Sequence, residues 1–163
     1  MSARPGVGTL LVTILGGTAW LHCNEQTARG APLGQTQAVT STEVITLTVS
    51  GRTRWLDTGV DLAMRQMIEI SVEGKIQWNK DGNQMCGPTG AAPYTRWGNK
   101  PIPGINTGAL IGKIGADSTD YFYIGPGQQA VAFASGRLFL GINDDNVLDN
   151  DGAFQVRIRV AKK

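Results

Sequence analysis

The sequence has few charged residues and almost none of the groups that enzymes use for proton transfer. Only 17% of its 163 residues are charged, and it holds a single histidine, His22. That histidine lies close to the N-terminus, so no Ser–His or Cys–His pair is expected. The net charge is only +2 and the basic residues are scattered, without the basic stripe of a nucleic-acid-binding protein. We predict a non-catalytic protein that does not bind nucleic acid.

Long apolar runs are also missing, and none approaches the roughly 18–20 residues of a membrane-spanning helix. A short apolar run, residues 7–15, follows Arg4 and precedes the small residues 17–19. This order is typical of a secretory signal peptide, which we place at residues 1–19. Residues 20–42 hold few large apolar side chains and are predicted to be a flexible linker. The protein is therefore expected to be secreted or held in the periplasm or cell envelope.

Cysteine is scarce, with only Cys23 and Cys86. A disulfide between them is compatible with export to an oxidising compartment, and lipid attachment at Cys23 is a second alternative. The bulky His22 directly before Cys23 fits a lipoprotein cleavage site poorly. Cys23 also lies in the predicted linker. We favour neither modification and interpret Cys86 as a structural residue.

Glycine is abundant, with 22 residues, and it separates short segments in which apolar and polar residues alternate. Such alternation predicts antiparallel strands that bury one face and expose the other. The last segment is the clearest, because Phe154, Val156, Ile158 and Val160 alternate with polar residues. The predicted strands are residues 43–49, 67–74 with an end at Gly74, 75–78, 109–115, 121–125, 136–142 and 152–160. We predict an all-β antiparallel sandwich or jelly roll of about eight strands over residues 43–163.

A long connection, residues 79–107, has no periodicity of its own and contains five glycines and four prolines. Loops of this length in compact domains are usually functional or disordered. Tyr94 and Trp97 lie inside it, and we therefore expect an ordered loop that packs on the sandwich.

A second connection, residues 143–152, is crowded with carboxylates. It contains Asn143, Asp144, Asp145, Asn146, Asp149, Asn150 and Asp151. Neighbouring carboxylates at 4 Å repel by about 1 kcal/mol even in water. A hard cation with oxygen ligands would offset this repulsion, and calcium is the natural candidate. The strands expected on each side exclude an EF-hand. The alternative is a solvated turn in which Asx side chains cap their own backbone.

Several motifs together resemble the small calcium-dependent galactophilic lectins of bacteria, the LecA-like group. They are residues 86–90 (CGPTG), 108–115 (GALIGKIG), 121–127 (YFYIGPG) and 138–158, with a weaker match at 55–62 (WLDTGVDL). The resemblance implies a galactose-binding jelly-roll domain. It also implies calcium ligands from the side chains of Asp144, Asp149 and Asn150 and from the backbone carbonyls of Cys86 and Asn146.

The resemblance further implies a sugar-binding role for the acidic residues Asp144, Asp145 and Asp149. The family's sugar-contacting histidine is missing from the long loop. Tyr94, Arg96 and Trp97 stand in that region instead, as stacking and hydrogen-bonding candidates or simply as loop anchors. Galactose is therefore an open choice of sugar. Weak single-site affinity would favour a homo-oligomer, because several linked sites bind more tightly than one.

Two other functions compete with a lectin. One is a structural module of the cell envelope, in which calcium only rigidifies the loop and no sugar binds. The other is a retroviral-type aspartic protease, because Asp57-Thr58-Gly59 matches the catalytic motif of that class. Such a protease needs two copies of the motif, and Val60 stands where a small residue is usual. A simple strand-connecting turn is the competing interpretation of this motif.

Overall fold

The structure is a computed structural model that describes residues 42–79, 84–94 and 98–161. The predicted signal peptide, nearly all of the predicted linker, Cys23, Arg96 and Trp97 lie outside the described residues. Among the residues described, no helix is long and apolar enough to cross a membrane.

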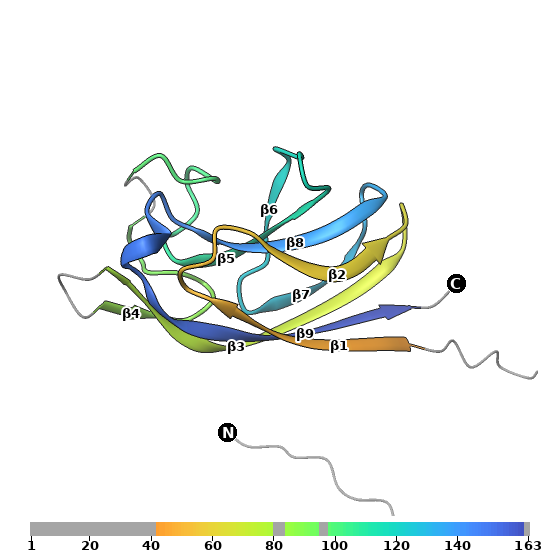
Figure 1. Cartoon of the computed structure of the whole chain (residues 1–163), viewed down its shortest axis with the longest axis horizontal. Coiled ribbons are helices and arrows are strands. Elements are labelled where there is room, and N and C mark those ends of the chain that lie inside the picture. Colours follow the sequence, from red (N-terminus) through yellow and green to blue (C-terminus); the bar gives the residue numbers. More distant parts are fainter. Residues whose placement is uncertain (1–41, 80–83, 95–97, 162–163) are drawn as a thin grey trace, which may run out of the picture. The chain divides into compact units, whose positions relative to one another are not determined.

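The described residues form two antiparallel sheets that pack face to face (Figure 1). One sheet has the order β1-β9-β3-β4, with β7 also paired to β3, and the other has the order β2-β8-β5-β6. This arrangement confirms the predicted all-β sandwich. The strands are β1 (Thr42–Ser50), β2 (Leu56–Leu62), β3 (Met67–Asn79), β4 (Gln84–Cys86), β5 (Ala109–Ile114), β6 (Tyr121–Tyr123), β7 (Gly127–Val131), β8 (Gly136–Asn143) and β9 (Asp151–Ala161).

The core lies between the sheets and follows the period-two pattern of the sequence. In β9, Phe154, Val156, Ile158 and Val160 are all buried, as predicted. The buried side chains of Ile68, Ile70 and Val72 in β3 lie beside them in the same sheet. The buried side chains of Leu138, Leu140 and Ile142 in β8 face them from the other sheet. Alternation therefore determined the inward face of these strands.

One predicted strand end was wrong. β3 runs without a break through Gly74, which pairs with Phe154 of β9. Gly74 has a φ of +104°, and a Cβ atom there would lie 2.7 Å from the carbonyl oxygen of Ala153. The glycine is needed because the neighbouring strand approaches closely, and it does not end the strand.

Three strands, β2, β4 and β7, were not predicted. β2 contains Asp57 and Thr58, so the strand-connecting turn considered for these residues was wrong. The short strands β4 and β7 pair with opposite ends of the same edge of β3, β7 with residues 67–71 and β4 with residues 76–79. β4 lies inside the segment that we predicted as one long loop. The sequences of β4 and β7 are too short to show an alternation of polar and apolar residues. They can be identified as strands only from their pairing with β3.

The acidic connection joins the two sheets. β8 belongs to one sheet and β9 to the other. The chain therefore crosses the end of the sandwich between β8 and β9 (Figure 1). This crossing, residues 143–151, contains the acidic residues.

Candidate functional site

A short 3-10 helix, η1 (Val147–Asp149), shapes the acidic connection. Asn146 caps it, because its side-chain oxygen accepts a hydrogen bond from the Leu148 amide at 3.3 Å. Val147 is buried in the core and fixes the helix to the sandwich. The connection is therefore an ordered element whose carboxylates have defined positions.

Asp144 is the central acidic residue of this connection and is only 3% exposed. Its Oδ2 accepts a hydrogen bond from the Asn150 side chain at 3.1 Å, and its Oδ1 accepts one from the Asn146 amide at 3.2 Å. Burial raises the pKa of Asp144 to about 6 despite these two bonds, and the neighbouring Asp145 carboxyl adds to the rise. The protein thus holds a carboxylate whose negative charge is poorly compensated.

Asn150 is fully buried and has one unsatisfied oxygen. Its Nδ2 donates to Asp144 Oδ2 and to the Gly51 carbonyl, both at 3.1 Å. These two acceptors determine the orientation of the Asn150 amide. If the amide were flipped, its oxygen would lie against two other oxygens and could accept no hydrogen bond from them. The remaining Oδ1 is buried and has no hydrogen-bond partner. A buried acceptor of this kind is costly unless another group, such as a water or an ion, satisfies it.

Three of the predicted residues line one hollow of about 180 Å³. Its walls are formed by Trp78, Asn79, Gly98, Thr107, Asp144, Asp145 and Asp149. Asp145 is exposed and Asp149 is half-buried, so the hollow leads from solvent to the buried Asp144. The structure therefore brings together residues from β3, the long connection and the acidic connection.

Two other predicted residues lie close to Asp144. Cys86 is buried and free, and its Sγ lies 3.9 Å from the Gly108 carbonyl oxygen. Burial raises the pKa of this thiol to about 12, and the charge of Asp144 contributes to the rise. Asn146 is exposed, and its amide is one of the two donors to Asp144.

Tyr94 was predicted as a sugar contact or a loop anchor. Its ring lies 4.9 Å from that of Trp78, which lines the hollow, and it packs against the hydrophobic core. This contact favours the anchoring role, as predicted for the long connection. Arg96 and Trp97, the other two candidates there, lie outside the described residues.

Sequence reasoning missed two arginines that hold the acidic connection in place. Arg54 donates to the carbonyl oxygens of Asp144 and Asp145 at 2.5 and 2.6 Å, and Arg52 donates to the carbonyl of Asn150 at 2.7 Å. Both lie between β1 and β2, 90 to 98 residues before their partners. No local pattern reveals such contacts, because they arise only when the two sheets close.

Lys100 was also missed. It is 5% exposed, and its ammonium group donates to the Tyr94 carbonyl at 2.8 Å and to Thr107 Oγ1 at 3.1 Å. Burial lowers the pKa of Lys100, and the charges of Asp144 and Asp145 oppose that effect. The Lys100 ammonium group therefore joins two parts of the long connection by hydrogen bonds. Its positive charge also offsets part of the negative charge of Asp144 and Asp145.

Asn143 holds the C-terminal part of the long connection through hydrogen bonds. It is fully buried, accepts from the Ile102 amide at 2.9 Å, and donates to three backbone carbonyls, those of Ile102, Ile105 and Asn106. The residue next to Asp144 therefore fixes the long connection against the end of β8.

The donor set fits a hard cation that takes oxygen ligands. No three His, Cys, Asp or Glu side chains cluster as a metal site within residues 42–79, 84–94 and 98–161. A cation here would therefore need amide and backbone oxygens beside its carboxylates, which calcium accepts. The unsatisfied oxygen of Asn150 and the charge of Asp144 are groups that such an ion would satisfy.

The protease motif lies elsewhere, on the surface of β2. Asp57 accepts from the Gly59 amide at 2.9 Å and pairs with Arg137 at 3.2 Å. The Gly59 hydrogen bond and, to a smaller degree, Arg137 hold the pKa of Asp57 below its ordinary value. Aspartic proteases instead need carboxyl groups that share a proton. The motif serves the strand and its surface ion pair.

No protein-family model and no curated protein match this chain. Solved structures do match it, and one is described as the N-terminal domain of EclA, a PllA-like lectin. The TM-score is 0.58 at 22% sequence identity, and the match covers 71% of this chain and 95% of that chain. At this identity the likeness shows a shared fold.

Proposed function

We propose that this protein is a non-catalytic, calcium-dependent carbohydrate-binding module. The observation that carries the proposal is the pair formed by Asp144 and Asn150. A buried carboxylate with a raised pKa contacts a buried amide whose oxygen has no partner. Both belong to an ordered connection beside a hollow that is lined by two more aspartates.

The likeness to a PllA-like lectin domain supports the carbohydrate-binding part of the proposal. The match spans nearly the whole of that domain. The lining of the hollow is also largely polar, with hydroxyl and carboxylate groups in its wall, as suits a ligand rich in hydroxyl groups.

The proposed calcium ligands are the side chains of Asp144, Asp149 and Asn150 and the backbone carbonyls of Cys86 and Asn146. Bound calcium would neutralise the carboxylates and offer coordination positions to two sugar hydroxyls. Arg52 and Arg54 orient the acidic connection by donating hydrogen bonds to its backbone carbonyls. In this proposal Asp144, Asp145 and Asp149 accept hydrogen bonds from sugar hydroxyls, and galactose is the first sugar to test. We further propose that the module is exported, on the basis of residues 1–19.

Thermal unfolding in chelator, then in calcium, then in calcium with a panel of sugars tests the proposal. A ligand at 100 times its Kd stabilises the native state by about 2.7 kcal/mol, which is roughly 10 °C in Tm for a domain of this size. We expect a rise with calcium and a further rise with the correct sugar. A rise with calcium alone would indicate a structural ion instead of a lectin.

Two matched variants locate the ion. Asp144→Asn should lose the calcium-dependent rise. In chelator the variant loses a buried charge but also replaces one of two acceptor oxygens with a donor, so its rise with calcium is measured against its own Tm in chelator. Asp151→Asn makes the same change in the same connection, but Asp151 is exposed and accepts from the Gly152 amide. It should respond to calcium like the parent. A calcium response that survives in Asp144→Asn would disprove the ligand assignment.

A further inference from the structure

β1 is an edge strand whose outer edge is unpaired within the described residues. It pairs with β9 over its full nine residues, from Thr42↔Ala161 to Ser50↔Ala153, with no register shift. Such an edge presents a row of free backbone N–H and C=O groups, which is a template for another strand.

The phase of the ladder shows which groups are free. The Gly51 amide donates to the Gly152 carbonyl at 2.9 Å, one pair beyond the end of β1. Hydrogen-bonded and non-hydrogen-bonded pairs alternate along an antiparallel ladder. The backbone N–H and C=O groups of odd-numbered β1 residues therefore point toward β9. Those of the even-numbered residues point away from β9, toward the open edge, and these residues are Thr42, Val44, Thr46 and Thr48.

The other strand edges are protected in ways that β1 is not. β4 and β6 have three residues each, and β7 has five. β2 is interrupted by a register shift between Asp57 and Asp61 and carries both of these charges. β1 is long and regular, contains no proline, lysine or arginine, and has one charged residue, Glu43. Proteins usually block such edges with charges, proline or bulges.

We propose that β1 pairs with β1 of a second copy, antiparallel and centred on Thr46, to form a homodimer with a continuous sheet. In this register Thr46 faces its own copy, Ile45 faces Leu47, and Val44 faces Thr48. Ile45 and Leu47 are half-buried and would cover each other on the inner face. Glu43 faces Val49, so no like charges oppose each other across the seam.

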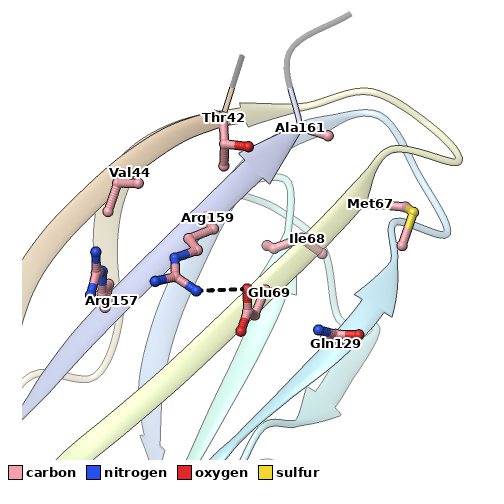
Figure 2. A pocket seen from close by; sticks show the side chains of 9 residues that line it. All are labelled: Thr42, Val44, Met67, Ile68, Glu69, Gln129, Arg157, Arg159 and Ala161. Carbon is pink, nitrogen blue, oxygen red and sulfur yellow. Dashed lines mark hydrogen bonds and ion pairs between the residues drawn. The ribbon is translucent and has the colours of Figure 1, made fainter. Parts of the chain in front are cut away.

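The outer face beside this edge is also suited to association. A shallow groove of about 500 Å³ lies there, and Thr42 and Val44 of β1 form one wall (Figure 2). Val44 is 46% exposed although it is apolar. Arg159 and Glu69 form an ion pair at 3.1 Å across the floor. A second copy at the β1 edge would cover Val44 and extend this face.

The dimer has a geometric consequence for the proposed binding sites. Asn150 contacts Gly51, so the acidic connection lies at the C-terminal end of β1. The two β1 strands run in opposite directions, and this places the two acidic connections at opposite ends of the joined sheet. If both sites bind sugar, the dimer would cross-link two separate glycans instead of binding a single surface through both sites. This consequence rests on the proposed function, whereas the dimer does not.

Sedimentation velocity of the full chain over micromolar concentrations tests the dimer without calcium or sugar. The parent should sediment with twice the mass of the chain. Thr46→Lys places two ammonium groups face to face at an exposed position, and should raise the dimer dissociation constant roughly 100-fold. Gln129→Lys adds the same charge to the exposed outer face of β7, opposite Glu69, and should remain dimeric. A monomeric parent, or a Thr46→Lys variant that stays dimeric, would overturn the proposal.

A cysteine variant tests the register and does not depend on how well the lysine variant folds. Hydrogen-bonded partners in an antiparallel pair have Cα and Cβ atoms about 5.5 Å apart, wider than the roughly 3.5–4.5 Å between the Cβ atoms of a disulfide but within reach of a short bifunctional thiol cross-linker. Thr46→Cys should therefore form a covalent dimer with such a cross-linker, beyond any formed by the parent through its own cysteines. Gln129→Cys should not. Absence of the Thr46→Cys dimer would rule out this register.

Discussion

The side-chain amide of Asn150 donates to Asp144 Oδ2 over 3.1 Å, where both residues are buried at the crossing between the two sheets. The bond stabilises the ionised form of Asp144, yet burial outweighs it and raises the pKa of this carboxyl. The same amide also binds Gly51 and thereby connects the acidic connection to the end of β1. Asn150 therefore both anchors the acidic connection to the sandwich and hydrogen-bonds its buried carboxylate.

Asn150→Ala should weaken both the fold and the calcium response. The change removes hydrogen bonds to the Gly51 carbonyl and to a buried carboxylate, a loss of roughly 2–4 kcal/mol in the free energy of unfolding. Chemical denaturation in chelator measures that loss, and titration with calcium measures the change in affinity.

Asn146→Ala is the matched control for this prediction. Only the backbone carbonyl of Asn146 is a proposed ligand, and its side chain caps η1. Loss of the cap should cost about 1 kcal/mol and leave calcium affinity nearly unchanged. Equal calcium affinities for Asn150→Ala and the parent would remove Asn150 from the ligand set.

Stability in chelator should fall as the pH rises from about 4 to about 6. The pKa of Asp144 is about 6 in the folded protein, above its ordinary value of 3.8. The folded state therefore binds more protons than the unfolded state in this window, and the free energy of unfolding decreases with pH. The decrease from this residue is on the order of 2–3 kcal/mol.

Calcium should change this pH profile. An ion that binds ionised Asp144 competes with its proton, so calcium affinity should fall as the pH drops through about 6. Thermal melts across the pH range, with chelator and with calcium, measure both effects. Asp144→Asn should remove the Asp144-dependent part of the chelator profile, and an unchanged profile in that variant would refute the assignment.

Gly98→Ala should separate sugar binding from calcium binding. Gly98 has a φ of +69°, and a Cβ atom there would lie 2.1 Å from Asp145 Oδ2. The Asp145 side chain must then move, and Asp145 is a proposed sugar contact but not a proposed calcium ligand. We expect weaker sugar affinity by isothermal titration with calcium affinity retained.

Gly104→Ala controls for backbone strain in this experiment. Its φ is +86°, and nothing lies within 4 Å of the added Cβ atom. Both variants should lose about 1–2 kcal/mol of stability from the left-handed backbone. If sugar affinity falls equally in the two, strain in the loop would explain the effect and Asp145 would not.

Several elements could be predicted because they depend on local patterns. The alternation of Phe154, Val156, Ile158 and Val160 was sufficient to identify β9 and its buried face. β4 and β7 were missed because short strands depend on a partner, and the strand end expected at Gly74 was wrong because the close approach of β9 is a tertiary contact.

The acidic composition of residues 143–152 and the period-two strands were determined by the sequence alone. Tertiary structure decided which of these acidic residues became buried and what surrounds them. Arg52 and Arg54 donate to backbone carbonyls of the acidic connection from a distant segment, and Lys100 in the long connection interacts with the charges of Asp144 and Asp145. The physical reason is that burial and long-range hydrogen bonds set the charge and orientation of a side chain, and both exist only after the two sheets have packed together.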